Sequence, residues 1–405
     1  SILLGNAAGE AFTAYALGMA AVGLGAAGFG TLSTARAFAE PFQSLAGFGL
    51  SSVAITLAAR RGGLDATLRG TILGLSGLFA VGSIALALGL AALTGRGGPL
   101  PVVALACVAI ALVPLSAAAS LPFQYAQAMH KVVALPFFLG LFRLGTAWLA
   151  WRAMRTVVGF QLSATLTGAL SAVLMLVVSR RVYGLRLRFD RGVARELLAL
   201  AWPAAALEFV VMAYMRASYL LLHDAGARVQ GEYAAADQLA KPVLVVTGAL
   251  MASSLPTVAA IAAGREFDRL TRVFRTALVR ALQVLVPLAT GVFFLAPYIL
   301  RKLAPDYVGA TTPFRVLLVG TLFMCLNQLS STFIVAMGRF RLFLMVAAVN
   351  FAVYLSLATR LIPRYQATGA AVATAVMEAV NTVMQLVIVA ILLRHARRAE
   401  GAVAS

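Results

Sequence analysis

Acidic residues are scarce in this sequence, since 14 Asp and Glu accompany 33 Lys and Arg and leave a net charge of +19 over 405 residues. Cysteine is rarer still. Cys107 and Cys325 both stand in apolar runs, which indicates small core residues rather than a disulfide framework. The three histidines lack metal-ligand spacing, and no Gly-x-x-x-x-Gly-Lys-Ser/Thr loop for nucleotide phosphates occurs. These absences argue against a metal centre, a disulfide-stabilised fold and ATP hydrolysis by this chain.

A long polar stretch is also missing, because the widest gaps between apolar runs, around 180–196 and 263–275, have room only for short amphipathic helices. Hydrophobic residues make up 61 % of the chain and charged residues 12 %, far from the balance of a soluble domain. Apolar runs of roughly 20 residues, enough to cross a bilayer as a helix, recur from end to end. We therefore predict an all-α polytopic membrane protein with twelve transmembrane helices. The predicted spans are residues 5–27, 30–59, 70–94, 101–128, 134–151, 157–179, 197–222, 232–262, 276–300, 313–336, 342–362 and 367–393.

The positive charge is concentrated in alternate loops between these spans. If the amino terminus is cytoplasmic, most of the Arg and Lys residues outside the spans fall in cytoplasmic loops, as the positive-inside rule requires. Both termini are then cytoplasmic, because the number of spans is even. The basic excess therefore orients the protein and meets anionic headgroups, and it does not indicate nucleic-acid binding.

Two segments 201 positions apart match each other, with their charges exchanged. GTLSTARAFAEP begins at residue 30 and GEYAAADQLAKP at residue 231, so Arg36 corresponds to Asp237 and Glu40 to Lys241. Internal repeats with charges at corresponding positions are typical of two-lobed transporters. The sequence thus predicts two pseudo-symmetric six-helix lobes around a central cavity. The predicted parts are an N-terminal lobe at 1–180, a cytoplasmic linker at 181–196 and a C-terminal lobe with a short basic tail at 197–405.

The four charges of this repeat allow two pairings. Residues four apart share a helix face, so Arg36 with Glu40, and Asp237 with Lys241, form pairs within a helix that lower the free energy of burial. If equivalent helices face each other across the cavity, Arg36 instead approaches Asp237, and Glu40 approaches Lys241, when the lobes close. Opening the cavity then breaks these pairs and frees Arg36 and Lys241 for an anionic substrate. The sequence leaves both pairings open.

Two further arginines interrupt apolar runs, Arg143 in FLGLFRLGTAW and Arg216 in FVVMAYMRASYLLL. A charge inside a membrane span is expected to face a cavity rather than lipid. The planar guanidinium fork is suited to phosphate oxygens. The predicted substrate-binding cations are Arg36, Arg143, Arg216 and Lys241, and the predicted gate partners are Glu40 and Asp237.

Acids inside the remaining spans are candidates for coupling transport to an ion gradient. Glu208 and Glu378 lie within predicted spans, and Asn350 and Asn381 add oxygen atoms in the last two spans. Such oxygens suit a proton relay or a hard cation such as Na⁺. The alternative is that both glutamates are protonated or paired structural residues. No cofactor is predicted apart from a coupling H⁺ or Na⁺.

Five segments in their order along the chain resemble the polysaccharide-transporter flippases of the multidrug, oligosaccharidyl-lipid and polysaccharide exporter superfamily. The resemblance implies a V-shaped pair of lobes that alternates between inward and outward access in the bacterial cytoplasmic membrane. It implies transfer of an oligosaccharide linked to a polyprenyl pyrophosphate, O-antigen or exopolysaccharide units, from the inner to the outer leaflet, driven by H⁺ or Na⁺. The segments are AGFGTLSTARAFAEPFQSLAGFGLSSVAITLAAR (27–60), RELLALAWPAAALEF (195–209), QGEYAAADQLAKPV (230–243) followed by LPTVAA (255–260), LAPYILRKLAPDYVGATTPFRVLLVG (295–320) and LIPRYQATGAAVATAV (361–376).

The same resemblance compares Glu208, Asn350 and Glu378 with the cation site that related lipid II flippases form in spans 7, 11 and 12. One departure weakens the span 7 part, because members often carry an aspartate after this span, where this chain has Arg216 and then Ala-Ser-Tyr. The implied partners are the lipid-linked glycan, membrane lipids and other membrane proteins of glycan assembly. The expected state is a monomer without nucleic acid.

Three other functions remain as alternatives. A drug or small-cation antiporter of the same superfamily is disfavoured, because a cavity rich in arginine repels cations. A lipid II-type flippase is disfavoured because that group generally has fourteen spans. A membrane-bound glycan polymerase or glycosyltransferase needs a catalytic loop with carboxylates or metal ligands, whereas the loops here are short and nearly free of acids. The chain is therefore expected not to be an enzyme.

Overall fold

The structure is a computed structural model that describes residues 2–184, 188–241, 244, 258, 261, 267–303, 305–336 and 340–404. Over these ranges the regular elements are helices and no strand occurs, which confirms the predicted all-α class. The long helices are α1 (Ile2–Gly47), α2 (Leu50–Arg60), α3 (Ala66–Thr94), α4 (Leu100–Tyr125), α5 (Leu135–Leu149), α6 (Val157–Tyr183), α7 (Arg191–Leu221), α8 (Ala227–Ala240), α10 (Phe267–Leu303), α11 (Thr311–Ala336) and α12 (Phe340–Ala404). Short 3₁₀ or π turns are η1 (Met129–Val132), η2 (Ala150–Met154), η3 (His223–Ala225) and η4 (Pro305–Ala310).

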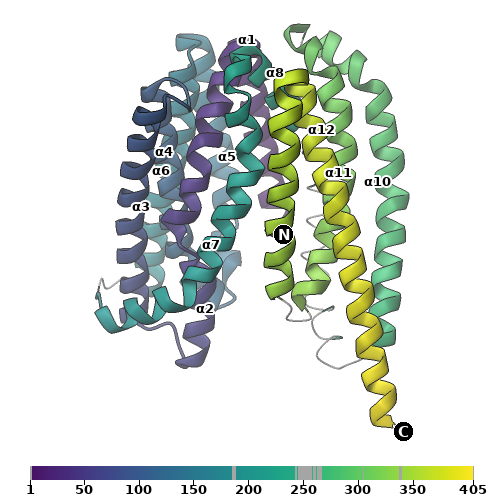
Figure 1. The fold of residues 1–405 in the computed structure, drawn as a ribbon. Coiled ribbons are helices and arrows are strands. Elements are labelled where there is room, and N and C mark those ends of the chain that lie inside the picture. Colours follow the sequence, from purple (N-terminus) through teal and green to yellow (C-terminus); the bar gives the residue numbers. More distant parts are fainter. Residues whose placement is uncertain are drawn as a thin grey trace. The chain divides into compact units, whose positions relative to one another are not determined.

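Two of these helices, α1 and α12, are each a pair of membrane spans. A straight helix of 46 residues such as α1 would be about 69 Å long, more than twice the roughly 30 Å of a bilayer core. The backbone leaves the helical region at Gly25 (φ 64°) in α1 and at Gln366 (φ 48°) in α12. Figure 1 shows the two arms of α12 lying side by side. Each reversal therefore joins two antiparallel spans.

The number of spans follows from these reversals. Among the described residues, nine stretches are long and apolar enough to cross a membrane. Two of the nine contain a reversal and count double, so the described part of the chain supplies eleven spans. The remaining predicted span, 232–262, lies mostly outside the described residues. This agrees with the prediction of twelve spans.

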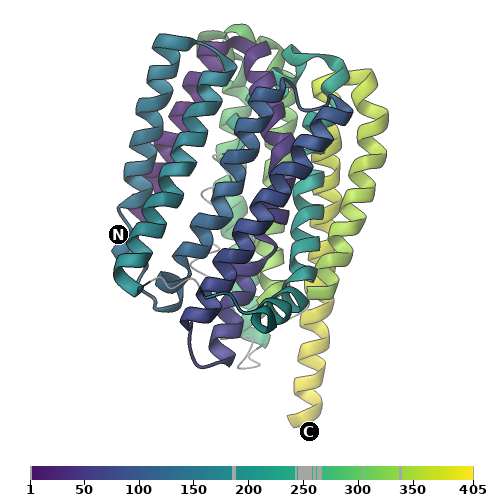
Figure 2. The same ribbon diagram turned by 90° about the vertical axis from the view of Figure 1, so that its left-hand side faces the viewer.

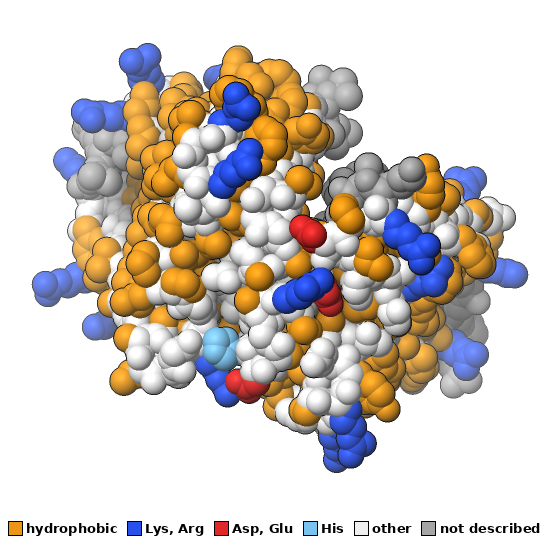
Figure 3. All heavy atoms as spheres, turned by 90° about the horizontal axis from the view of Figure 1, so that it is seen from above, with side chains coloured by type: hydrophobic (Ala, Val, Ile, Leu, Met, Phe, Trp, Pro, Cys, Tyr) orange, Lys and Arg blue, Asp and Glu red, His pale blue; other side chains and the backbone are white. Residues whose placement is uncertain are grey.

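The chain divides into two compact units, residues 1–231 and 232–405. These units are defined by which helices pack together. Helix α7 contacts α1, α2 and α3 and so belongs to the first unit. The predicted lobes at 1–180 and 197–405 stay a prediction. In a space-filling view, many of the visible side chains are hydrophobic and basic side chains are scattered among them (Figure 3). Exposed apolar side chains are what contact with lipid requires.

The first unit is organised around α1, which packs against α3, α4, α5 and α7 (Figure 2). Its core includes Leu68, Ile72 and Leu197, which are fully buried. Helices come closest where glycines face each other. A Cβ added to Gly30 would lie 2.7 Å from the backbone nitrogen of Gly231, and one added to Gly231 would lie 3.1 Å from the nitrogen of Gly30. These two glycines occupy equivalent positions of the sequence repeat, and side chains at either would collide with backbone.

One end of the first unit is fixed by capped helix starts. Asp65 accepts a hydrogen bond from the backbone N–H of Leu68 (2.7 Å) and begins α3, and Asp190 does the same for Val193 (2.8 Å) and begins α7. Such caps satisfy backbone donors that a helix leaves unpaired at its first turn.

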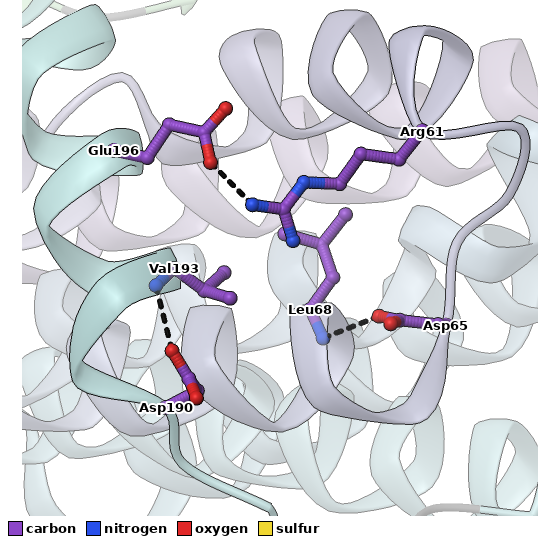
Figure 4. Close-up of polar contacts among 6 residues, drawn as sticks. All are labelled: Arg61, Asp65, Leu68, Asp190, Val193 and Glu196. Carbon is purple, nitrogen blue, oxygen red and sulfur yellow. Dashed lines mark hydrogen bonds and ion pairs between the residues drawn. The ribbon is translucent and has the colours of Figure 1, made fainter.

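An ion pair between Arg61 and Glu196 lies beside the two caps and ties the end of α2 to α7 (Figure 4). Figure 1 shows α7 as a bent helix, and Pro203 inside it removes a backbone hydrogen bond, which is the usual cause of such a bend. Within the predicted linker, residues 191–196 are thus the first turns of α7.

The second unit consists of α8 from Glu232 onward, α10, α11 and both arms of α12, with the most extensive packing between α11 and α12. Its core contains Leu270, Phe333 and Val389, and the ring of Phe274 meets that of Phe333 edge-on at 4.8 Å. The close packing of α11 on α12 encloses a set of polar side chains, among them Asn327, Glu378 and Asn381.

Candidate functional site: charged clusters inside the helical units

Depth within the first unit explains which charges can meet. Because α1 reverses at Gly25, Glu10 on its first arm and Arg36 and Glu40 on its second arm lie 15, 11 and 15 residues from the turn. At 1.5 Å per residue these three side chains stand at similar depths, roughly 16–23 Å from the turn. The sequence repeat singled out Arg36 and Glu40, whereas Glu10 was missed although it lies inside the first predicted span.

Arg36 is anchored by an amide from a neighbouring helix. Its Nε donates a hydrogen bond to Oε1 of Gln161 on α6 (2.8 Å), and Gln161 is almost completely buried. The charges of Arg143 on α5 and of Glu40 on α1 both act on Arg36, the first by repulsion and the second by attraction. The structure therefore brings together two of the predicted substrate-binding cations, Arg36 and Arg143.

Arg143 is balanced by an acid that the sequence prediction did not include. The carboxylate of Glu10 on α1 attracts the Arg143 guanidinium. A buried charge is costly unless an opposite charge or hydrogen bonds compensate it, so Glu10 makes the position of Arg143 tolerable. The signal for Glu10 was available, since it is an acid in an apolar run, as Glu40 is.

Arg216, the third predicted cation of this unit, forms an ion pair with Glu40. The pair joins α7 to α1, and the two side chains are 22 % and 28 % exposed. No helical spacing relates the two residues, so the sequence analysis assigned a role to each of them but did not predict that they are in contact. These interactions link six residues into one group, which we call the arginine cluster. Its members are Glu10, Arg36, Glu40, Arg143, Gln161 and Arg216.

The matching charges of the second unit pair within their own segment. Lys241 Nζ lies 2.7 Å from Asp237 Oδ2, and the two residues are four apart. This is one of the two pairings that the sequence left open. The cross-lobe pairs, Arg36 with Asp237 and Glu40 with Lys241, stay a prediction.

Glu378 is the centre of a polar group between α11 and α12. Its side chain is 4 % exposed, and Oε2 accepts hydrogen bonds from Nδ2 of Asn327 (2.6 Å) and Nδ2 of Asn381 (3.4 Å). Asn381 Oδ1 in turn accepts from Nε2 of Gln385 (2.9 Å). Two predicted coupling residues, Glu378 and Asn381, are therefore in contact, and Asn327 and Gln385 join them as partners that the prediction lacked.

Several oxygen atoms of this region have no hydrogen-bond partner among the described residues. They belong to Asn327, Gln385 and Asn350, whose side chains are all buried. A buried oxygen without a partner is unfavourable, and a hard cation or a water molecule satisfies it. Asn350 lies on the other arm of α12, 16 residues before the reversal at Gln366, against 12 residues after it for Glu378. The two are therefore within about 6 Å of each other in depth.

The fourth predicted coupling residue, Glu208, belongs to the first unit. It lies on α7 with an exposed side chain. Among the described residues, no three or more His, Cys, Asp and Glu gather in a way that suits a transition-metal site. Of the two predicted coupling glutamates, Glu378 is the one for which the described structure shows hydrogen bonds to polar side chains.

Comparison with solved structures identifies the fold. An inward-facing multidrug resistance MATE family transporter of the MOP superfamily matches with a TM-score of 0.78 at 14 % identity, covering 96 % of each chain. The fold is that of MOP superfamily transporters. The lipid II flippase MurJ in an inward closed conformation matches with a TM-score of 0.75 at 16 % identity, covering 96 % of this chain and 87 % of that one.

A MOP superfamily transporter from Pyrococcus furiosus, described as having a binding pocket of reverse polarity, matches with a TM-score of 0.67 at 11 % identity over 98 % of this chain and 94 % of that one. Neither protein-family models nor curated proteins gave a match to the sequence. The chain thus has the fold of these multi-pass membrane proteins, and nine stretches of its described residues are long and apolar enough to cross a membrane.

Proposed function

We propose that this protein is a flippase that moves an oligosaccharide linked to polyprenyl pyrophosphate from the inner to the outer leaflet of the bacterial cytoplasmic membrane. The observation that carries the proposal is the arginine cluster, which places Arg36, Arg143 and Arg216 together inside an apolar helical unit. The fold, shared with transporters that alternate between inward- and outward-facing conformations, supplies the motion.

The electrostatic argument favours a polyanionic substrate. A pyrophosphate must cross a medium of low dielectric constant, where an uncompensated charge is highly unfavourable. Arginine compensates that charge with two parallel hydrogen bonds to phosphate oxygens, and it stays charged when buried. Three arginines against two glutamates leave the cluster with an excess positive charge, which attracts phosphates and repels cationic drugs.

Glu40 is the proposed internal competitor of the substrate. Its carboxylate occupies Arg216 in the structure, so a phosphate that binds Arg216 must displace it. Arg36 is positioned by its hydrogen bond to Gln161, an uncharged amide. In the predicted gate, the displaced Glu40 then pairs with Lys241 and Arg36 with Asp237 when the lobes close. Substrate binding and gate position are thereby coupled through the same acids.

The energy source in this proposal is an H⁺ or Na⁺ gradient that acts at Glu378. The carboxylate, two asparagines and Gln385 supply oxygen atoms of the kind that a proton or a hard cation uses. Three buried oxygens of this region have no hydrogen-bond partner within the part of the chain that the structure describes. Glu208 is the proposed second acid of the coupling path. The remaining expectations, a monomer without cofactor that meets other glycan-assembly proteins in the membrane, belong to the same proposal.

A lipid II-type flippase is the second candidate function, favoured by the structural match to MurJ. The two candidates differ in the glycan, so the identity of the bound lipid distinguishes them. A drug antiporter is less favoured in spite of the match to a MATE transporter, because of the positive arginine cluster.

The test is mass spectrometry of the lipids that copurify with the full chain and with Arg36→Ala. A phosphate-rich glycolipid bound to the wild type and lost in the variant supports the proposal, and its glycan separates the two flippase functions. Arg96→Ala is the matched control, because Arg96 lies outside the cluster in the turn after α3. Recovery of the same bulk phospholipid from wild type and Arg36→Ala, with no glycolipid in either, would overturn it.

A further inference from the structure

The first arm of α1 contacts α5 near Gly9 and the following π turn η2 near Gly23, and between these contacts the space around Gly18 and Gly145 is open. At one point the backbone of Gly9 on α1 meets α5, where a Cβ on Gly140 would lie 2.7 Å from the Gly9 carbonyl oxygen. At the other, a Cβ on Gly23 would lie 2.5 Å from the indole of Trp151. The order of these contacts shows that the first arm of α1 and α5 run in the same direction. Residues between the two contacts are therefore available to form a groove.

A groove with a volume of about 980 Å³ lies in this interval. Its floor is open over two glycines, Gly18 and Gly145, since a Cβ added to either would meet no atom within 4 Å. Its walls are apolar, and several of them are large side chains left exposed by the protein itself. The principal wall residues are Tyr15, Val22, Leu141, Leu144 and Trp148.

The length and depth of the groove correspond to one leaflet. From Ala14 to Val22 the groove extends about 12 Å along α1, and a leaflet contributes about half of the roughly 30 Å bilayer core. Val22 lies three residues from the reversal at Gly25, whereas Ala14 lies near the middle of its arm. The groove thus runs from the bilayer centre toward the surface at the α5–α6 turn.

The surface end of the groove carries positive charge in a defined arrangement. Trp151 lies in the π turn η2, and Arg155 directly after that turn has its guanidinium carbon 5.7 Å from the Trp151 ring centre. Arg155 Nε also donates to the carbonyl oxygen of Trp151 (3.2 Å), which holds the side chain at the groove end. Its backbone has φ 48°, an unfavourable left-handed conformation for a residue with a side chain.

Two neighbours add to this positive potential. Arg152 lies in the same turn, and the amino terminus of α6 begins after its cap Thr156, so the positive end of that helix dipole points to the same place. The segment from Ala150 to Phe160 contains both arginines and no acid. An apolar groove of leaflet depth that ends in two arginines is complementary to a lipid with a hydrocarbon chain and an anionic phosphate.

We propose that the α1–α5 groove binds one acyl chain of an anionic phospholipid from the surrounding leaflet, with its headgroup phosphate on Arg155. The occupant is a bilayer lipid because the groove is lined by exposed apolar side chains of membrane-spanning helices and is one leaflet deep. The site is distinct from the arginine cluster but adjoins it, since Arg143 directly precedes Leu144 of the groove wall and Glu10 lies one turn before Ala14. Occupancy therefore fixes the separation of the two helices that carry Glu10 and Arg143.

The experiment measures lipid retention by native mass spectrometry, with the full chain in phosphatidylcholine nanodiscs that contain a graded fraction of phosphatidylglycerol. Gly145→Leu places a side chain in the groove, and its Cβ meets no atom within 4 Å. Gly82→Leu on α3 is the matched control, because a Cβ at this helical glycine also meets no atom within 4 Å. Inside a membrane an acyl chain is held by van der Waals packing and not by the hydrophobic effect, so a side chain that occupies the groove removes most of the contacts that retain it. Gly145→Leu is therefore expected to lower phosphatidylglycerol retention roughly three- to tenfold. Gly82→Leu is expected to retain the lipid as the wild type does.

The headgroup part is tested by Arg155→Gln, which should remove the preference for phosphatidylglycerol over phosphatidylcholine while Arg96→Gln keeps it. If Gly145→Leu does not fold, photo-crosslinking of wild type with a diazirine-labelled phosphatidylglycerol replaces it, and labelled peptides are expected from residues 14–22 and 141–151. Equal retention in Gly145→Leu and Gly82→Leu, or labelling spread over the other helices, would overturn the proposal. Displacement of the label by a polyprenyl phosphate but not by phosphatidylglycerol would also overturn it and assign the groove to the carrier lipid.

Discussion

Glu40 on α1 forms an ion pair with Arg216 on α7, and both side chains are mostly withdrawn from solvent. The pair connects two helices that the sequence repeat did not relate. It has two consequences, because removing either partner leaves a partly buried charge without compensation, and because Arg216 can bind a phosphate only when Glu40 has moved.

The first prediction concerns this pair. Arg216→Gln alone and Glu40→Gln alone should each lower the free energy of unfolding by about 1–3 kcal/mol, and the double variant should lose less than the sum. Thermal unfolding in detergent measures the cycle. Additive losses would mean that the two residues do not interact in the protein. In transport assays, Glu40→Gln should bind pyrophosphate lipid more tightly and release it more slowly, since the competitor of Arg216 is gone.

The second prediction concerns the anchor of Arg36. Gln161→Ala removes the only side-chain hydrogen bond that the described structure gives to the Arg36 guanidinium. We expect substrate affinity to fall by about tenfold, close to 1.4 kcal/mol, because the arginine loses its orientation but keeps its charge. The measurement is binding of a short-chain prenyl diphosphate to the purified protein. Gln124→Ala is a suitable control, because Gln124 bonds to Ser120 on its own helix and not to the cluster. An unchanged affinity in Gln161→Ala would contradict the positioning role.

The fold class was predictable from the sequence because long apolar runs indicate which segments lie in the lipid bilayer rather than in water. Apolar runs of bilayer length predict helices wherever they occur, so the all-α class and the number of spans follow without knowledge of packing. The repeat at Arg36 and Glu40 likewise picked out charges that the structure places inside a unit. Charge in an apolar run is informative because burial is unfavourable enough to require a reason.

Partnerships were not predictable, because they depend on which helices are neighbours. Nothing in the spacing of Glu40 and Arg216, or of Asn327 and Glu378, indicates a contact across 176 or 51 positions. Glu10 was left out of the predicted site for a different reason. Its position in the first apolar run was sufficient to mark it as a candidate, but the sequence analysis did not use it. The polar group around Glu378 was half predicted for the same reason: the acid is visible in the sequence, whereas its amide partners resemble ordinary helix residues.

The third prediction concerns ion coupling. Glu378→Gln keeps the size of the side chain and can still bond to Asn327 and Asn381, but it cannot carry a negative charge. Transport driven by an imposed H⁺ or Na⁺ gradient should fall at least tenfold, while substrate binding without a gradient stays within about twofold of the wild type. The assay compares flipping in proteoliposomes with and without each gradient. Gradient-driven flipping at the wild-type rate would exclude Glu378 from coupling and leave Glu208 as the remaining acid.

The last prediction concerns the contact of Gly30 with Gly231, where a side chain on either residue would collide with the backbone of the other helix. Backbone cannot move aside as a flexible side chain can, so Gly30→Leu and Gly231→Leu should each destabilise the protein by more than the 1–3 kcal/mol typical of an overpacked core. The readout is the folded fraction after solubilisation, measured by size-exclusion chromatography and thermal unfolding. Gly82→Leu and Gly291→Leu are matched controls, because both glycines are in long helices with open space around them. A leucine changes helix propensity equally at all four sites, so a loss confined to Gly30 and Gly231 reports the close approach itself. Equal behaviour of all four variants would show that these helices do not meet at the two glycines.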